Sequence, residues 1–593
     1  MSEKITLLRD KAAVRWTALV FLAFAMFCSY IFMDILSPIK DLMQSTRGWS
    51  STAFGTMQGS ETFLNVFIFF LIFAGIILDK MGVRFTAILS GIVMLAGAVI
   101  NWYAVTEMFA GTSLEAWFNA HLNYIPVFDQ LGVAPFYGER LKIFVGLTAD
   151  GLENFKIIRP ELLQDGMVVK EVIAAMPASA KFATVGFMIF GCGVEMAGIT
   201  VSRGIVKWFK GREMAMAMGS EMALARLGVA TCMIFSPVFA KFGGHVDVSR
   251  SVAFGVILLM IALIMFIVYF FMDKKLDAQT GEVEEKDEPF KIRDIGKILS
   301  SSGFWLVALL CVLYYSAIFP FQKYAVNMLQ CNIAFASELP KESYWASTQV
   351  TVIQYIVMLV VAAAAFISNF SKNKTIKIGL LAISAVFLVI FCVMGYMRQS
   401  HETIFAVFPL LAVGITPILG KYVDTKGKAA SMLMIGSILL IACHLTFAFI
   451  LPQFKGNAES GILVAYITIL VLGSSFSLVP AALWPSVPKL VDSKVIGSAY
   501  ALIFWIQNIG LWLFPTLYGK ILDNSNKDIL LAVQEKLMTE ETAAVSYSHT
   551  VPLTMFALLG VAALIIGFIL KSVDKKKGIG LELPNIKPDI QAE

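Results

Sequence analysis

The chain has 593 residues, of which 58% are hydrophobic and only 15% are charged. Its mean hydropathy of +0.76 lies far outside the range of soluble globular proteins, so the composition predicts a polytopic protein of the lipid bilayer. The net charge of +5 is small for this length and reflects lysines in loops, which argues against a nucleic-acid-binding protein.

Apolar stretches of about 20 residues, the length needed to cross the hydrocarbon core, recur along the chain. Six lie within residues 1–272, near 14–38, 53–77, 84–105, 181–206, 214–241 and 250–272. Residues 273–300 are polar and are expected to form a cytoplasmic linker. Eight more stretches lie within residues 301–593, near 303–329, 348–368, 376–397, 402–423, 429–452, 461–486, 495–520 and 550–571. The pattern predicts an all-α integral membrane protein with fourteen spans in two halves.

Two segments are added to this plan. Residues 106–180 form a charged outer insert with short β-like runs, KIFVGL and GMVVKEVIAAM. We expect this insert to be either a family-specific decoration or a docking surface for an outer partner. Residues 348–397 hold two of the apolar stretches and are expected to form an extra helical hairpin in the second half.

Lysines and arginines gather in alternate loops, which places both termini in the cytoplasm by the positive-inside rule. The segment Glu3–Leu8, EKITLL, fits an acidic dileucine sorting signal and favours a lysosomal membrane. The unusual inserts and the lack of glycosylation sequons in the outer loops favour the bacterial cytoplasmic membrane, which is the location that we expect.

A short motif occurs once in each half. GIILDKMGVR ends the second span and GKYVDTKGK ends a later one, so Gly75, Asp79 and Gly82 recur 345 residues on at Gly420, Asp424 and Gly427. Small residues allow close helix approach, and the Asp can pair with a basic residue at a neighbouring helix end. The repeat predicts a cytoplasmic latch with two copies. Its expected gating residues are Asp79, Arg84, Arg203, Asp424 and Lys428.

The paired motifs, the six-span half and the charged linker resemble the major facilitator superfamily of secondary transporters. Within it, YIFMDILSP, WFKGRE, ARLG, YYSAIFPF, CHLTFAF and the stretch from LWPSVPKL to WIQNIGL are similar to the branch that contains the lysosomal dipeptide uniporter. The resemblance implies two six-helix halves that rock about a central site. It also implies that Glu195 and Arg226, which match cavity residues of that branch, contact the substrate.

Glu195 and Arg226 are charges inside apolar spans. Glu195 precedes Lys207 by twelve residues and Arg226 follows Arg212 by fourteen, or about 18 Å and about 21 Å of helix from the same cytoplasmic edge. Charges at such depth are costly unless they face protein, water or an opposite charge. We therefore expect them to lie level in a central site and to bind the ammonium and carboxylate ends of a short peptide.

Several other residues are weaker candidates. Tyr315 and Gln507 are expected to contact the substrate, and Asp34, near the outer end of the first span, is expected either to contact substrate at the outer mouth or to be solvated. Glu61 is interpreted as a solvated pore residue and Glu221 as a structural one. The remaining polar or aromatic groups in the second half, which are more typical of packing, are Tyr314, Gln322, Lys323, His444, Trp484 and Asn508.

The sequence contains neither a zinc-protease helix nor a phosphate-binding glycine loop nor a paired-cysteine metal motif, so we expect no enzyme, cofactor or metal. The function that we expect is transport of a small zwitterionic solute, most plausibly a dipeptide. Two alternatives stay open at this point. One is an organic-anion or nitrate-like exchanger, in which Arg226 alone would be needed. The other is a transporter-like receptor or scaffold.

Overall fold

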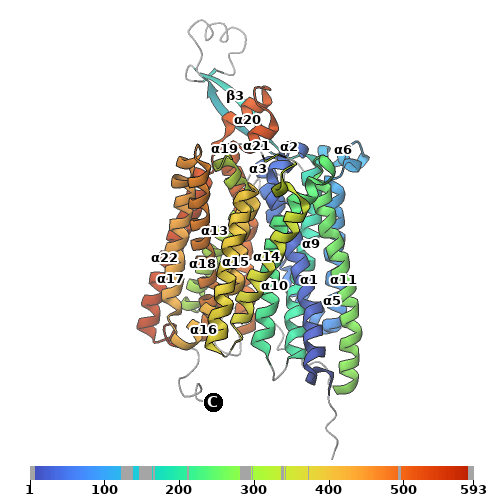
Figure 1. Ribbon diagram of the computed structural model, residues 1–593, viewed down its shortest axis with the longest axis vertical. Coiled ribbons are helices and arrows are strands. Elements are labelled where there is room, and N and C mark those ends of the chain that lie inside the picture. Colours follow the sequence, from blue (N-terminus) through green and yellow to red (C-terminus); the bar gives the residue numbers. More distant parts are fainter. Residues whose placement is uncertain are drawn as a thin grey trace, which may run out of the picture.

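A computed structural model describes residues 7–121, 138–145, 163–164, 167–209, 213–280, 296, 298–335, 339–340, 342–371, 373–491 and 496–584. Its long helices run side by side along the longest axis of the molecule (Figure 1). Thirteen helices of this described part are long and apolar enough to cross a membrane, in agreement with an all-helical membrane protein. We call the end that carries the β-strands the outer end, following the predicted orientation.

The first half is built from five long helices and several short ones. Its helices are α1 (Ala12–Met33), α2 (Lys40–Arg47), α3 (Ser51–Gly59), α4 (Phe63–Ile68), α5 (Phe70–Val105), α6 (Ser113–Ala120), α9 (Ala178–Trp208), α10 (Met214–Ala240) and α11 (Val248–Thr280). A 3₁₀ turn, Ser60–Thr62, joins α3 to α4.

The second half contains α13 (Ser302–Asn332), α14 (Thr348–Ser368), α15 (Lys374–Met397), α16 (His401–Lys426), α17 (Ala429–Leu445), α18 (Ala458–Leu490), α19 (Ile496–Ser525), α20 (Lys527–Gln534), α21 (Glu540–Ala544) and α22 (Thr550–Lys577). Polar side chains begin several of these helices. The Ser347, Asn373 and Ser400 side chains each accept a hydrogen bond from a backbone N–H in the first turn that follows, as helix N-caps do.

The chain reverses direction inside α5. Gly82 has φ 78° and ψ 167°, so Phe70–Val105 consists of two helical segments that meet at this residue. The second and third expected spans share α5, which counts as one long helix. The fourteen expected spans therefore agree with the thirteen long helices. Gly427, the matching residue of the second motif copy, also has a positive φ of 74°. Both copies of the motif thus place glycine where other residues would be strained.

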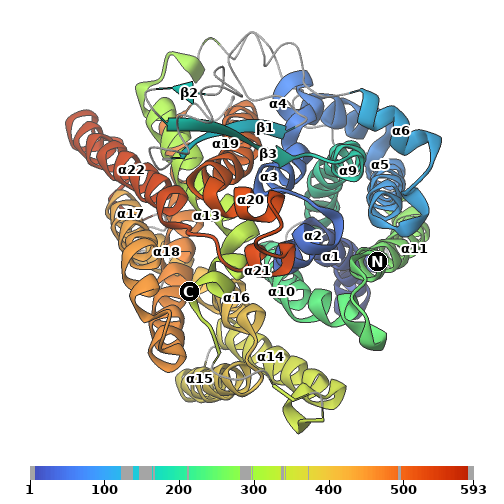
Figure 2. The same ribbon diagram turned by 90° about the horizontal axis from the view of Figure 1, so that it is seen from above.

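The hairpin of α14 and α15 lies at the edge of the bundle, beside α16 and α10 (Figure 2). Tyr355 of α14 packs edge-on against Phe235 of α10, with ring centroids 4.9 Å apart. Its hydroxyl also accepts a hydrogen bond from Thr231 at 3.4 Å. The hairpin therefore covers a seam between the two halves.

The outer insert contains a three-stranded antiparallel sheet with strand order β1 (Gly138–Val145), β3 (Met167–Ala175), β2 (Leu163–Gln164). Strands β1 and β3 overlap the two β-like runs of the sequence, of which Gly146, Leu147 and Gly166 lie outside the described residues. Strand β3 contacts α20, so the insert packs on the last outer loop of the second half (Figure 1).

Helix α11 continues through the first residues of the expected linker, to Thr280. The reason is that Asp273 is buried and paired there. Its carboxylate accepts hydrogen bonds from Lys207 at 2.7 Å, from Trp208 at 2.9 Å and from Tyr269 at 3.2 Å. Such bonding removes the cost of continuing a helix through a buried charge.

Helices α5 and α9 pack through glycine. A Cβ atom on Gly97 would collide with the backbone of Phe190 and Gly186 on α9. On the same helix α5, Gly75 has open space around its Cα. Close backbone approach at small residues is the usual way in which membrane helices associate.

We predict that Gly97→Val destabilises the protein by about 1–3 kcal/mol, because the added atoms must displace a helix backbone. Thermal unfolding of the purified protein in detergent measures the change. Gly75→Val is the matched control and should leave the melting temperature within experimental error of wild type. Equal stability of Gly97→Val and wild type would contradict this packing.

Candidate functional site

Glu195 lies in the middle of α9 and reaches the second half. It is partly buried, and its carboxylate accepts a hydrogen bond from the Asn508 amide of α19 at 3.3 Å. The Asn65 side chain of α4 also interacts with it. Glu195 is thereby held by two amides, from α19 and α4, rather than by a cation.

Arg226 of α10 is enclosed by aromatic rings. Its guanidinium carbon lies 5.6 Å from the ring centroid of Tyr30, 5.2 Å from that of Phe319 and 4.9 Å from that of Phe476. These rings come from α1, α13 and α18, so Arg226 also contacts the second half. Cation–π contact stabilises the charge but leaves the N–H donors of the guanidinium unused.

The structure does not pair the two expected charges with each other. Among the described residues, neither a hydrogen bond nor an ion pair holds the Arg226 guanidinium. The Tyr30 hydroxyl lies within electrostatic reach of Arg226 and of Glu195, which places both charges around one aromatic ring. Their equal depth stays a prediction.

Tyr315 and Gln507 lie in the same region, but their polar atoms are engaged. The Tyr315 hydroxyl accepts a hydrogen bond from Trp484 at 3.2 Å, and its ring stacks on Phe319 at 5.4 Å. The Gln507 amide oxygen accepts a weak bond from Cys311 at 3.4 Å. Tyr315 thus stacks against Phe319, the ring that contacts Arg226.

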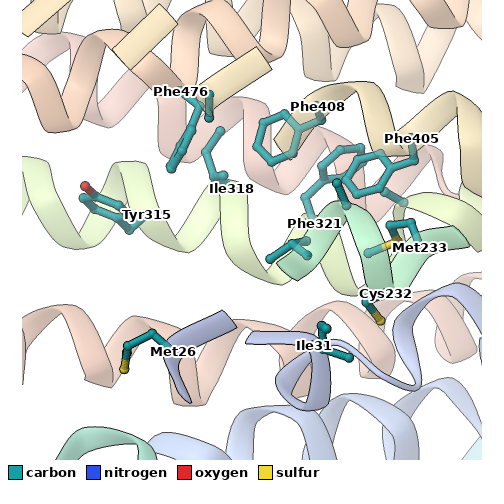
Figure 3. Packing of buried hydrophobic residues seen from close by; sticks show 14 of the residues in the cluster. Met26, Ile31, Cys232, Met233, Tyr315, Ile318, Phe321, Phe405, Phe408 and Phe476 are labelled. Atoms are coloured by element: carbon teal, nitrogen blue, oxygen red, sulfur yellow. The ribbon is translucent and has the colours of Figure 1, made fainter. Parts of the chain in front are cut away.

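Asp34 is not solvated at the outer mouth. Only 1% of it is exposed, and it forms an ion pair with Lys323 of α13 at 2.8 Å. Gln322 donates a second bond at 2.7 Å and Ser37 a third at 3.2 Å. The expectation of a wet residue is therefore wrong, because a cation from the other half neutralises the carboxylate within the core. Figure 3 shows the adjoining apolar core, in which Phe321 and Ile318 of α13 face aromatic residues of the second half.

A second lysine and aspartate lie near each other between the halves. Here the lysine belongs to the first half and the aspartate to the second. Asp523 of α19 accepts bonds from the backbone N–H groups of Ser51 at 3.1 Å and Thr52 at 2.7 Å, at the N-terminus of α3. Lys40 of α2 is 1% exposed, interacts electrostatically with Asp523, and lies 5.9 Å and 5.5 Å from the Tyr324 and Tyr547 ring centroids. Sequence reasoning missed both residues, because a single sequence does not show which span ends meet.

The same polar cluster contains His549, just before α22. Burial, followed by the nearby Lys40 charge, lowers the pKa of His549 well below its usual range, so the ring is neutral. Its Nδ1 accepts or donates a hydrogen bond with the Tyr518 hydroxyl at 2.8 Å. The outer contact between the halves is therefore polar, buried and extensively bonded.

Tight packing of α3 and α4 on α19 extends this contact inward. Tyr324 donates a hydrogen bond to the Ser51 carbonyl at 2.9 Å, and Trp505 donates one to the Val66 carbonyl at 3.0 Å. Cβ atoms on Gly55 or Gly59 would collide with the α19 backbone. These contacts join the halves from the outer end to mid-bundle, so the structure is closed toward the outside.

At the cytoplasmic end, the described ion pairs of the latch residues stay within one half. Arg203 pairs with Asp79 at 2.7 Å, as the motif predicts. Arg84 pairs instead with Asp277 of α11 at 2.6 Å. The second-half copy differs again, since Lys428 lies 3.9 Å from Glu582. Asp424 has interactions of its own. The gating role of these residues stays a prediction.

Two helical halves around a central cluster of charges form an arrangement that is typical of secondary transporters. The sequence model of the Major Facilitator Superfamily matches residues 171–400. Among solved structures, a mutant of the nucleoside transporter NupG superposes with a TM-score of 0.54 at 11% identity, over 93% of this chain and 98% of that one. A bacterial homologue of the human lysosomal transporter Spinster superposes with a TM-score of 0.53 at 10% identity, over 95% and 98%.

Curated relatives give the closer comparison in sequence. The lysosomal dipeptide transporter MFSD1 of Bos taurus is 25% identical over 57% of this chain and 58% of its own length. Its Homo sapiens counterpart is 23% identical over 57% and 59%, and that of Danio rerio is 24% identical over 60% and 64%. The matches therefore span less than two thirds of these relatives. Over these stretches the chain is similar to the Major Facilitator Superfamily, and it is a distant relative of MFSD1.

The outer contact can be tested through Cys232, which is fully buried beside the Asp34–Lys323 pair. Asp34→Asn leaves Lys323 buried without its anion, which costs about 3–5 kcal/mol in the outer-closed state. We predict that this variant raises the rate at which an impermeant maleimide labels Cys232 from outside by about fivefold or more.

Asp247→Asn is the matched control, because Asp247 pairs with Arg250 in its own outer loop. Cys232→Ser should abolish the labelling signal. An unchanged labelling rate in Asp34→Asn would show that the pair does not hold the outer side closed.

Proposed function

We propose that this transporter moves short peptides, dipeptides above all, by alternating access. The observation that carries the proposal is the Arg226 guanidinium, which interacts electrostatically with Glu221 but, among the described residues, has neither a hydrogen bond nor an ion pair with a carboxylate or carbonyl. A guanidinium presents five N–H donors in a fork that matches a carboxylate. Within a membrane bundle such a group is retained at high cost, which favours a role in binding. The terminal carboxylate of a peptide supplies the missing acceptor.

Glu195 supplies the opposite end of the site. Its carboxylate is held by the neutral amides Asn508 and Asn65, which orient it and leave its charge uncompensated. A peptide ammonium group is the complementary ligand. The charged ends of a dipeptide lie about 7 Å apart, within the reach of two side chains on neighbouring helices. Dipeptide transport, for which the MFSD1 relatives are named, supports the same substrate class.

The substrate enters and leaves as the halves rock against each other. In the structure the outer contact is formed, with Asp34 on Lys323 and Asp523 on the α3 N-terminus. Opening the outer side must break these bonds. The latch residues Asp79, Arg84, Arg203, Asp424 and Lys428 are proposed to close the cytoplasmic side in that alternate state.

An organic-anion exchanger is the second candidate, since the free guanidinium would serve any carboxylate. The two substrate classes differ in their need for Glu195. A peptide carries an ammonium group that Glu195 can bind, whereas an organic anion carries none. A receptor that binds through residues 106–180 is a third candidate of another class. For the membrane, we propose the bacterial cytoplasmic membrane, with the lysosomal membrane as the alternative.

We predict that Arg226→Ala lowers uptake of labelled alanyl-alanine into proteoliposomes about thirtyfold or more, because loss of a charged partner costs about 2–5 kcal/mol. Arg226→Lys should lose most of the activity, since an ammonium cannot form the two-pronged bond. Arg250→Ala, an outer-loop arginine, is the control. Uptake that survives in Arg226→Ala would refute the assignment.

Glu195→Gln separates the candidates. A peptide transporter should lose uptake about tenfold or more in this variant, because the ammonium of the substrate loses its anion. An anion exchanger should keep its flux. If no solute flux but only a binding signal is found in wild type, the receptor alternative is supported and transport is refuted.

A further inference from the structure

The chain turns back after α22 and lies on the second copy of the glycine–aspartate motif. Helix α22 ends at Gly578, which has a positive φ of 64°. Residues 578–584, which we call the strap, then contact the turn between α16 and α17, at the cytoplasmic end opposite the strands (Figure 1). Leu581, at the centre of the strap, is fully buried. The strap is therefore part of the packed structure.

Gly427 of the motif makes room for the strap. A Cβ atom on Gly427 would collide with the backbone of residues 582–584. Beside it, the backbone N–H of Lys428 donates a hydrogen bond to the Glu582 carbonyl at 3.1 Å. A glycine at this position thus serves the close approach of a second stretch of backbone, in addition to its positive φ.

The Glu582 side chain completes the N-terminus of α17. Its carboxylate accepts hydrogen bonds from the Ser431 backbone N–H at 2.8 Å and from the Ser431 hydroxyl at 2.9 Å, and it lies 3.9 Å from the Lys428 ammonium. Lys428 is the N-cap residue of α17, but its side chain accepts no capping hydrogen bond. A carboxylate satisfies the free N–H groups of a helix N-terminus and is favoured there by the helix dipole. The strap thus supplies the cap that α17 itself lacks.

The first half makes the corresponding contacts within its helices. Arg84, which follows the first motif copy, pairs with Asp277 at 2.6 Å, and Lys207 of α9 pairs with Asp273 at 2.7 Å. Both carboxylates belong to the continuous helix α11. In the second half, Lys489 of α18 instead donates hydrogen bonds to two carbonyls of the strap, at 3.0 Å and 2.9 Å. These acceptors lie on a short non-helical segment, which can detach without unfolding a span.

We propose that the second motif copy is a binding site for the strap, an acidic segment of the chain itself, and that docking of the strap holds the outer side closed. This inference rests on the proposed alternating access, in which Asp424 and Lys428 help to close the cytoplasmic side. The docked strap covers Gly427 and engages Lys428 through Glu582, so the motif cannot meet the first half. A contact that exists in one state only shifts the equilibrium toward that state. Release of the strap therefore favours the outer-open state.

The test is labelling of Cys232 from outside by an impermeant maleimide, with the full-length protein in proteoliposomes. Glu582→Ala removes the cap of α17 and the partner of Lys428, and it should raise the labelling rate by about threefold or more. Glu593→Ala, which removes a carboxylate outside the strap, is the matched control and should label at the wild-type rate. Cys232→Ser, combined with Glu582→Ala, should abolish the signal.

A covalent link tests the opposite direction. Ser431→Cys and Glu582→Cys are introduced together and joined by a bifunctional maleimide, which fixes the strap on α17. Uptake of labelled alanyl-alanine should then fall by about fivefold or more, because the motif can no longer be released. The same double variant treated with a monofunctional maleimide, which blocks the thiols without joining them, is the control and should keep its uptake.

The outcomes separate this inference from the substrate proposed above. An unchanged labelling rate in Glu582→Ala would overturn the role of the strap. That holds even if the melting temperature falls, because the strap would then only stabilise the second half. Uptake that survives the covalent link would overturn it as well. Faster labelling in Glu582→Ala, in a protein whose wild type takes up no dipeptide, would support the strap and refute only the proposed substrate.

Discussion

A guanidinium kept inside a membrane bundle without a hydrogen bond or close ion pair from the described residues is the constraint around which the central site is arranged. The three rings that surround Arg226 come from α1, α13 and α18, so its environment exists only when both halves are assembled. Aromatic contact lowers the cost of the buried charge and still leaves its donors available. Glu195 shows the complementary arrangement, since amides orient it and no cation neutralises it. Each charge is stabilised enough to persist and is free to bind.

The outer contact between the halves, by contrast, brings buried charges close to opposite charges and to the N–H groups of a helix end. Asp34 of the first half meets Lys323 of the second, while Asp523 of the second half caps α3 of the first near Lys40. The sign of the charge alternates between the halves, which fixes the register in which they can meet. Buried ion pairs contribute little net stability but are costly to disrupt one partner at a time. They suit a contact that is specific and that, in the proposed transport cycle, opens in each turn.

The sequence was sufficient for the class of protein and for most of the helices. Hydropathy and length located the spans, and the repeat singled out Gly82 and Gly427, whose positive φ only the structure shows. The pair of Asp79 and Arg203 also followed from the motif. These features are local, or recur at a fixed offset, and so are visible in a single chain.

The partners of the remaining charges were not visible in the same way. Asp34 and Lys323 are 289 residues apart, and nothing in their neighbouring sequence indicates that they meet. Arg84 is predicted to act at the latch, but in the structure it pairs with Asp277. Asp277 lies in the part of α11 that extends into the segment predicted to be a polar linker. Glu61 is predicted to be a solvated pore residue from its depth. That its turn packs against Gly191, beside Asn65 and Glu195, follows only from the structure.

The central claim is that Arg226 binds the terminal carboxylate of a peptide, and a thermodynamic cycle of binding tests it most directly. Affinities of alanyl-alanine and of its methyl ester are measured by calorimetry for wild type and for Arg226→Ala. If the claim holds, esterification and the substitution each weaken binding by about tenfold or more, and the two together weaken it no further than either alone. Additive losses would mean that Arg226 and the carboxylate act independently, which would contradict the account.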